Sequence, residues 1–206
     1  MAVLASGRGS NLKSILEAMK DPAWPAEVAL VLSDVQKAPA LGVAREAGIE
    51  AIAIDPDRKG PRLSSNAETT ILAALAERAI RCLVLAGFMR ILSRSFLRSF
   101  EGPVLNIHPS LLPAFPGLDA QGQAFRHGVR VAGATVHLVD EGIDTGPIVA
   151  QSAVTVHAND DRDALANRIL EAEHRLYPEA IRKVLTVPYV VEGRRLRFHE
   201  EETSRS

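Results

Sequence analysis

Asn106 and His108 stand two positions apart, after the apolar run 103–105 and directly before Pro109. Side chains two positions apart on a strand point to the same face, so both are expected to project from one strand end while Ile107 turns to the core. Pro109 cannot continue a sheet ladder and ends the strand. An amide can steady an oxyanion and an imidazole can exchange protons near neutral pH, so the pair suits a reaction at a carbonyl group. A capped strand end with a structural histidine is the alternative that the pair alone leaves open.

Asp140, Glu141 and Asp144 lie in a glycine-bounded turn further along the chain. Taken singly, each is best explained as a solvated or turn-capping carboxylate. A carboxylate beside His108 would favour the imidazolium and raise the pKa of the ring, which suits a proton donor at neutral pH. His137, on the strand that leads into the turn, is either a second imidazole of the site or a packed strand residue. No spacing of histidine or cysteine resembles a metal site, so no metal is expected.

A glycine-rich segment, Ser6-Gly7-Arg8-Gly9-Ser10-Asn11, follows the first apolar run. Glycines allow a tight turn and close approach of the backbone. Ser10 or Asn11 is expected to cap the next helix, whose free amides and dipole would cradle a phosphate. Leu12 stands where a dinucleotide fingerprint has its third glycine, and the P-loop spacing with its Lys-Ser/Thr pair is absent. A single phosphate monoester is therefore the favoured ligand, with an ordinary strand-to-helix turn as the alternative.

Apolar runs and helical patterns alternate through the first half of the chain, which predicts an α/β fold with a doubly wound, mostly parallel sheet. The second half shows polar–apolar alternation around a glycine-rich bend, which predicts antiparallel strands there. Pro178 is expected to kink or break the last long helix, residues 189–198 to form a hairpin, and the polar tail 200–206 to fray. The expected strands are 1–5, 28–32, 49–54, 82–86, 104–108, 133–139 and 148–156, and the expected helices are 12–19, 40–47, 66–78, 93–100, 120–127 and 161–184.

A doubly wound sheet binds its ligand outside the carboxyl ends of its strands, where the strand order reverses. The loops after the first and fourth strands are expected to meet there. The second of these loops, 87–92, is unusually apolar for an exposed loop. A flat heterocycle could lie against it and hydrogen-bond to its backbone. The alternative is that Met89, Ile91 and Leu92 fold back into the core.

Composition sets outer bounds on function. The 206 residues suit one domain over 1–206, and the core is aliphatic, because 47% of the residues are apolar and only 4% aromatic. A net charge of −1, from 24 basic and 25 acidic residues, gives no support for nucleic-acid binding. Cys82 is the only cysteine, no apolar stretch reaches membrane-spanning length and no signal peptide is visible, so a cytoplasmic location without membrane contact is expected.

Four segments taken together are much more specific than any one of them: 7–11, 87–92, 106–113 and 136–146, the last containing Asp144. On these segments the chain resembles the phosphoribosylglycinamide formyltransferases, a family of folate-dependent enzymes of purine synthesis. The similarity runs from about Val3 to about Val184. It implies a Rossmann-like formyltransferase fold and transfer of the formyl group of 10-formyltetrahydrofolate to the amine of glycinamide ribonucleotide, in the de novo route to IMP.

The resemblance also implies which part of the chain binds each substrate and which part carries catalysis. The half 1–100 would bind the ribotide phosphate, and 101–188 would carry catalysis and folate binding, with a hairpin and tail at 189–206. The implied partners are two small molecules, glycinamide ribonucleotide and the formyl-folate co-substrate, with no metal; a homodimer is left open. The implied catalytic residues are Asn106, His108 and Asp144, and the implied ribotide contacts are Gly9, Ser10, Asn11 and Glu173. The implied folate contacts are Arg62, Met89, Arg90, Ile91, Leu92, Asn106, Asp140, Glu141, Gly142, Ile143 and Asp144.

Two positions depart from the family pattern: Asp119 stands where some members carry histidine, and Leu170 where a polar substrate contact is expected. Both bear on ribose recognition. A formyltetrahydrofolate hydrolase would share the catalytic trio but carry an extra N-terminal domain, whereas this chain begins at its first strand. A tRNA-directed formyltransferase would carry a further C-terminal domain and a basic surface. A non-catalytic folate- or nucleotide-binding module would need no proton donor, so the trio argues against it.

Overall fold

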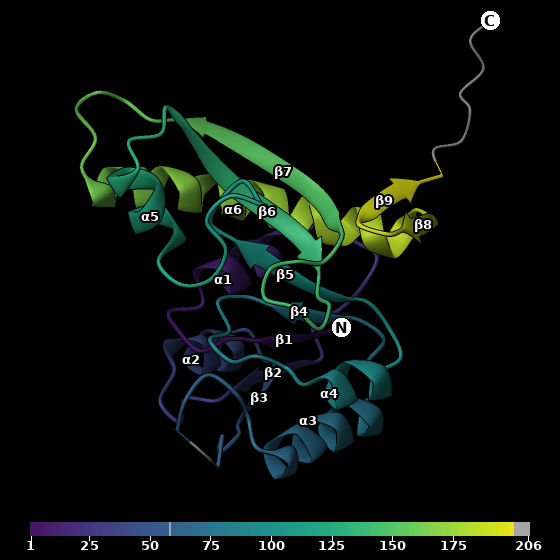
Figure 1. Ribbon diagram of the computed structural model, residues 1–206. Helices are drawn as coiled ribbons and strands as arrows, with labels where there is room; N and C mark the ends of the chain where they lie inside the picture. Colours follow the sequence, from purple (N-terminus) through teal and green to yellow (C-terminus); the bar gives the residue numbers. More distant parts are fainter. Residues whose placement is uncertain (58, 200–206) are drawn as a thin grey trace, which may run out of the picture.

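A computed structural model describes residues 1–57 and 59–199 of the chain. Within these residues, nine strands form one sheet in the order β3-β2-β1-β4-β5-β6-β7-β9-β8 (Figure 1). The strands are β1 (Ala2–Leu4), β2 (Leu30–Ser33), β3 (Glu50–Ala53), β4 (Leu83–Leu85), β5 (Val104–His108), β6 (Val131–Leu138), β7 (Ile148–Thr155), β8 (Tyr189–Glu192) and β9 (Arg195–Phe198). The helices are α1 (Ser10–Ala18), α2 (Pro39–Glu46), α3 (Ser65–Glu77), α4 (Arg94–Ser99), α5 (Ala120–Arg126) and α6 (Arg162–Thr186).

The parallel part of the sheet is built outward from β1. This strand lies between β2 and β4 and pairs in parallel with both. β3 extends the sheet beyond β2, and β5 extends it beyond β4, again in parallel. The strand order therefore reverses at β1, and the loops after β1 and β4 leave the sheet side by side at this switch point. The predicted doubly wound, mostly parallel sheet is confirmed.

Alternate residues of the central strands enter two separate cores, because successive side chains of a strand point to opposite faces. In β1, Val3 joins the buried cluster beneath α1, α2 and α6, while Leu4 joins the one beneath α3 and α4. Helices thus cover both faces of the parallel part (Figure 1). The buried Tyr177 hydroxyl of α6 lies 3.0 Å from the carbonyl oxygens of both Leu85 and Leu105, which ties this helix to β4 and β5.

The sheet changes direction at β5, whose far edge pairs antiparallel with β6, and β6 pairs antiparallel with β7. The register sets Asn106 opposite His137 and His108 opposite Thr135. Cross-strand partners share a face of the sheet, so these four polar side chains gather on the face opposite α6. The β6–β7 register shifts between Val136 and His137, and irregularities of this kind re-aim side chains next to functional sites.

The predicted antiparallel strands, hairpin and helices are confirmed, with bounds that differ by at most two residues from those expected. One detail was wrong, and one of two alternatives is excluded. Gly9, not Ser10 or Asn11, occupies the N-cap of α1. Helix α6 continues through Pro178, so the helix does not break there; its buried face packs in the core and holds the helix together. The tail 200–206 lies outside the described residues. None of the described helices is long and apolar enough to cross a membrane.

Candidate active site

The strand end at β5 presents the asparagine and histidine that the spacing predicts. Asn106 is half-buried and His108 is buried, while Ile107 enters the core beneath α6. The amide nitrogen Nδ2 of Asn106 lies 3.2 Å from Nε2 of His137, its cross-strand partner. The other ring nitrogen of His137, Nδ1, lies 2.8 Å from the carbonyl oxygen of Leu138. Of the two readings of His137, the structure supports the one that places it in the site.

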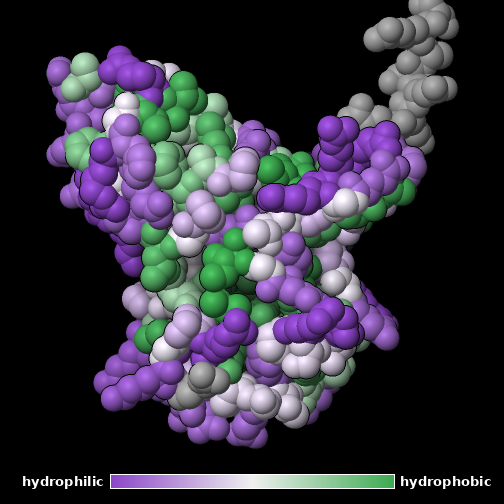
Figure 2. Space-filling model, in the orientation of Figure 1, coloured by the Kyte–Doolittle hydropathy of each residue, from purple (hydrophilic) through white to green (hydrophobic). Residues whose placement is uncertain are grey.

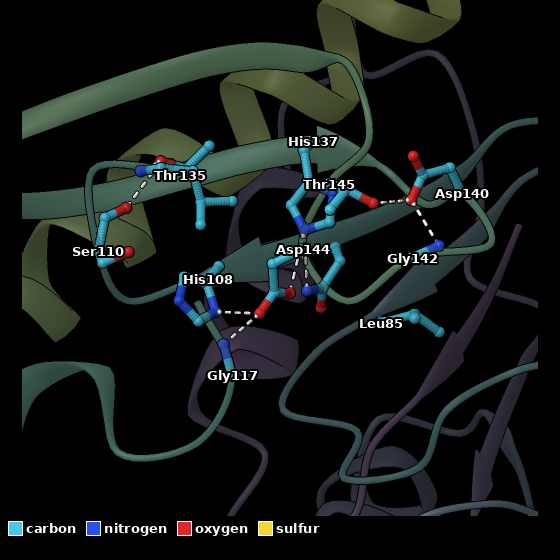
Figure 3. A network of polar contacts seen from close by, with 12 residues as sticks. Leu85, His108, Ser110, Gly117, Thr135, His137, Asp140, Gly142, Asp144 and Thr145 are labelled. Atoms are coloured by element: carbon cyan, nitrogen blue, oxygen red, sulfur yellow. Dashed lines mark hydrogen bonds and ion pairs between the residues drawn. The ribbon is translucent and has the colours of Figure 1, made fainter. Parts of the chain in front are cut away.

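Asp144 reaches this strand end from the turn between β6 and β7, as Figure 3 shows. Its Oδ2 atom lies 3.3 Å from Nδ1 of His108, and its Oδ1 atom lies 3.5 Å from Nε2 of His137. The backbone N–H of Gly117 donates to Oδ2 over 2.7 Å. The structure therefore brings together Asn106, His108 and Asp144, which are distant in the sequence, with the carboxylate held between two imidazoles.

The loop after β5 closes the site from the other side. Thr135 holds this loop, because its hydroxyl donates to the Ser110 carbonyl over 2.7 Å and accepts from the Leu112 amide over 3.0 Å. Further along, the loop places the Phe115 carbonyl 2.8 Å from Nε2 of His108. Both ring nitrogens of His108 thus face an acceptor, and only the doubly protonated ring can donate to both.

Burial and charge pull the ionisation of this cluster in opposite directions. Burial lowers the pKa of His108, and the Phe115 carbonyl and the Asp144 charge only partly oppose it. The Asp144 charge does raise the pKa of His108, as expected of a carboxylate beside the ring, but desolvation outweighs it, so the net pKa lies below the ordinary value of histidine. Burial alone would raise the pKa of Asp144, but hydrogen bonds from His137 and Gly117 together with nearby positive charge lower it. Asp144 is the group that stays charged.

The glycine-rich loop between β1 and α1 turns on Gly9, which has a φ of 77°. A Cβ atom there would lie 2.9 Å from the Cα atom of Ala40, so both the conformation and the space require glycine. The first amides of α1 follow at Ser10 and Asn11, and no side chain within residues 1–57 and 59–199 caps them, so they can bind a ligand. This geometry agrees with the predicted phosphate cradle.

Glu173 on α6 meets this loop. Asn11 donates through Nδ2 to its Oε2 atom over 2.7 Å, while the buried Oδ1 of Asn11 has no hydrogen-bond partner among the described residues. Glu173 is only 5% exposed, and burial raises the pKa of its carboxyl to about 7, against the opposing hydrogen bond from Asn11. The pair offers an acceptor and a titratable acid next to the amides of α1, which suits recognition of a polar, amine-bearing ligand.

The loop 87–92 is split between surface and core. Met89 is 60% exposed and Ile91 is half-buried, whereas Leu92 packs in the core beneath α3 and α4. Arg62, placed among the folate contacts by resemblance, forms an isolated parallel bridge with Ile91, so it lies beside this loop. The Arg90 side chain turns inward instead, with Nε 2.6 Å from the carboxylate of Asp34. Its Nε and Nη1 atoms are therefore engaged within the protein.

In the turn 140–146, some side chains shape the turn and others are exposed at its surface. Asp140 accepts from the amide of Gly142 and the hydroxyl of Thr145, which shapes the turn that carries Asp144 (Figure 3). Glu141 forms an ion pair with Arg94 of α4. Ile143 is 56% exposed at the tip. Figure 2 shows hydrophobic residues gathered across the middle of this face, between the upper and lower parts of the molecule.

Sequence reasoning missed several residues that build this site. Thr135 holds the loop after β5, and the carbonyl of Phe115 and the amide of Gly117 contact the catalytic candidates. Thr135 stands two positions before His137 on one strand, so the same spacing argument could have found it, whereas backbone groups leave no signal in the sequence.

Asp119, which departs from the family pattern, pairs with arginines of α5 and α6, Arg126 and Arg162, over 3.0 and 2.7 Å. The described residues contain no cluster of three or more metal-binding side chains.

A doubly wound sheet with an amide, an imidazole and an acid gathered at the end of β5 is an arrangement that suits a class of acyl-transfer enzymes. The sequence pattern of that class, described as "Formyl transferase", matches residues 1–181, so the chain belongs to the formyl transferase family. Its relatives include the phosphoribosylglycinamide formyltransferase of Bacillus subtilis (strain 168), which is 43% identical over 184 residues, covering 89% of this chain and 93% of the relative.

Two further comparisons agree. The crystal structure of glycinamide ribonucleotide transformylase 1 from Symbiobacterium toebii superposes with a TM-score of 0.89 at 46% identity, covering 96% of this chain and 92% of that one. The human trifunctional purine biosynthetic protein adenosine-3 is 40% identical over 184 residues, which is 89% of this chain and 18% of that protein. The similarity to phosphoribosylglycinamide formyltransferases thus spans nearly the whole chain.

Proposed function

We propose that this enzyme transfers the formyl group of 10-formyltetrahydrofolate to the amine of 5'-phosphoribosylglycinamide. The products are N-formylglycinamide ribonucleotide and tetrahydrofolate, a step of de novo purine biosynthesis. Family membership and the relatives' names support the reaction. The single observation that carries the assignment of the site is the contact between Asp144 and His108, 3.3 Å apart across 36 residues of sequence, at the strand end that also carries Asn106.

The reaction proceeds by direct attack. The substrate amine adds to the formyl carbon, a tetrahedral intermediate forms, and the bond from that carbon to the folate nitrogen breaks. The amine loses a proton and the departing nitrogen gains one, with no covalent enzyme intermediate. Asn106 donates to the developing oxyanion, and His108 in its charged form stabilises the same oxygen and helps deliver the proton. Asp144 favours the charged ring and relays protons, because its negative charge lies against Nδ1.

Residues from both halves of the chain contribute to the proposed site of each substrate. In the half 1–100, the amides at Gly9, Ser10 and Asn11 would hold the ribotide phosphate. Glu173, hydrogen-bonded to Asn11, would bind the glycinamide side. The folate would lie against the exposed part of loop 87–92 and the turn 140–146, beside Arg62, and receive hydrogen bonds from their backbone. The half 101–188 supplies catalysis, with all elements acting as one domain.

The decisive assay uses purified protein with 10-formyltetrahydrofolate, with and without glycinamide ribonucleotide. Tetrahydrofolate that forms only when the ribotide is present supports the transferase. Equal release without the ribotide would assign the chain to the hydrolases instead, in which water replaces the amine.

Variants test the residue roles. Asn106→Ala removes an oxyanion donor and should lower kcat by roughly 10²–10³. His108→Ala and Asp144→Asn should each abolish most turnover while tetrahydrofolate still binds. His157→Ala, on the exposed surface, is the matched control and should keep full activity. Near wild-type turnover in any of the three site variants would remove that residue from the mechanism.

The proposed reaction and the single cysteine also bear on the partners and the cellular location of the enzyme. Its substrates are small molecules, and a single cysteine, Cys82, buried in the core, suits the reducing cytoplasm. Neither nucleic acid nor membrane enters the proposed reaction. Sedimentation of the purified chain distinguishes a monomer from a homodimer.

A further inference from the structure

Asp34, at the end of β2, is a buried acid that the proposed mechanism does not use. The residue is 8% exposed. Its Oδ1 atom accepts from the Ser6 hydroxyl over 2.5 Å, and its Oδ2 atom lies 2.6 Å from Nε of Arg90. Ser6 opens the glycine-rich loop and Arg90 belongs to loop 87–92. One carboxylate therefore joins the two loops that flank the switch point of the sheet.

The two loops are also joined directly. The Ser6 amide donates to the Gly87 carbonyl over 3.1 Å, and the Ser6 hydroxyl accepts from the Met89 amide over 2.9 Å. That hydroxyl donates its own proton to Asp34, so the carboxylate fixes the direction of the Ser6 hydrogen bonds. The orientation of the Met89 backbone thus depends on Asp34 through one intervening side chain.

Arg90 extends the network to a third loop, because its Nη1 atom donates to the carbonyl of Gly60. The Arg90 side chain is 17% exposed and that of Asp34 only 4%. A guanidinium that spans a carboxylate and a carbonyl in fixed directions cannot be replaced by a flexible ammonium. Removing the acid would leave a largely buried cation without its partner, which displaces the loop that carries it.

We infer that Asp34 is a positioning residue that couples the phosphate loop, 6–11, to the folate loop, 87–92. Ordering of one loop by its ligand is transmitted to the other through Ser6 and Arg90, so each ligand raises the affinity for the other. This inference rests on the proposed function for the identity of the two ligands. Asp34 touches neither.

The test measures this coupling with an unreactive pair of ligands. Tetrahydrofolate has no formyl group, so it binds together with glycinamide ribonucleotide without turnover. The ratio of its Kd without and with saturating ribotide, measured by calorimetry, is the coupling factor. We expect a factor of about 5 or more in the wild type, at the lower end of usual couplings. Asp34→Asn, in which one oxygen becomes a donor, should bring the factor close to 1.

Ser6→Ala is the second variant. It removes the hydroxyl that connects the loops without disturbing the Asp34–Arg90 pair, and it should also bring the coupling factor close to 1. If Asp34→Asn does not fold, Ser6→Ala still decides the matter. The double variant should lose no more coupling than either single one, because both interrupt the same path.

Asp160→Asn is the matched control. Asp160 pairs with Arg168 over 2.6 and 2.9 Å, its side chain is 6% exposed, and it lies outside the loops at the switch point. It should keep the wild-type factor. Two bound ligands with unchanged coupling in a folded Asp34→Asn or Ser6→Ala protein would overturn this inference alone. A wild-type protein that binds neither ligand would overturn the proposed function and, with it, this inference.

Discussion

His108 has two ring nitrogens that meet different partners, a carboxylate and a backbone carbonyl. Both contacts favour the charged ring, yet burial makes the neutral ring the easier state to keep in the protein. The pKa of His108 therefore lies below the ordinary value of histidine, and the ring takes up its second proton only as the pH falls below that ordinary value. Asp144 thus acts against desolvation rather than pushing an exposed histidine to a higher pKa.

Asp144→Asn should therefore lower the pKa of His108 further, because the variant removes the negative charge that opposes burial and leaves the other causes in place. Titration of the ring by NMR measures the change. Asp160→Asn, an acid with no contact to the ring, should leave the His108 titration where it is in the wild type. A His108 pKa that rises in Asp144→Asn would contradict the assignment of the opposing charge.

Glu173 should make folding stability depend on pH. Its pKa is raised from 4.5 to about 7, so the folded protein holds this proton more tightly than the unfolded chain. The stabilisation is complete below about pH 4.5 and is lost as pH rises through about 7. Relative to Glu173→Gln, the wild type should lose on the order of 3 kcal/mol of unfolding free energy across that window.

Urea unfolding at a series of pH values measures this difference. Glu179→Gln changes an exposed acid on the same helix and should keep the wild-type pH dependence. Parallel stability curves for wild type and Glu173→Gln would show that Glu173 titrates at the same pH in the folded and unfolded chain.

At the scale of elements, short loops at the ends of β1, β4, β5 and β6 carry the site, and each is held by specific contacts. In the turn 140–146, close packing leaves no room for a side chain at one position. Gly146 is buried, and a Cβ atom there would lie 1.8 Å from the carbonyl oxygen of Leu138. Since that oxygen belongs to a paired strand, the turn rather than the strand must move when a side chain is added.

Gly146→Ala should move Asp144 away from His108, and a displacement of about 1 Å is enough for a loss of roughly 10²-fold in kcat. Steady-state kinetics measures the loss. Gly42→Ala, in α2, is the control, because a Cβ there meets no described atom within 4 Å. It should keep activity and gain about 0.5–1 kcal/mol in unfolding free energy, since alanine suits a helix better than glycine. Equal activity of the two variants would mean that the turn adapts without moving the acid.

At the scale of the molecule, one sheet runs through both halves of the chain, since β4 from the first half pairs with β5 from the second. Helix α6 packs on strands and helices from both halves. We expect a single cooperative unfolding transition. Trp24, the only tryptophan, reports on the first half, while far-UV circular dichroism reports on the whole chain, so the two denaturation curves should coincide. Separate midpoints would divide the chain into two domains.

Most of the fold could be predicted because its signals are local. Apolar runs and helical periodicity identified the strands and helices, and proline ended β5 at His108 as expected. The cap of α1 was wrong because serine and asparagine favour that position in general, whereas here a close approach to Ala40 requires glycine. Helix α6 passes Pro178 because tertiary packing outweighs the loss of one hydrogen bond.

The sequence by itself determined which chemical groups are present, since Asn106, His108 and a carboxylate in the turn follow from residue type, strand spacing and resemblance. The resemblance had already named Asp144 as the acid; only the tertiary structure decided that this acid lies between two imidazoles, those of His108 and His137, and that the Arg90 side chain turns to Asp34. It also decided the net direction of the His108 pKa, because desolvation depends on every atom packed around the ring, whichever part of the chain supplies it.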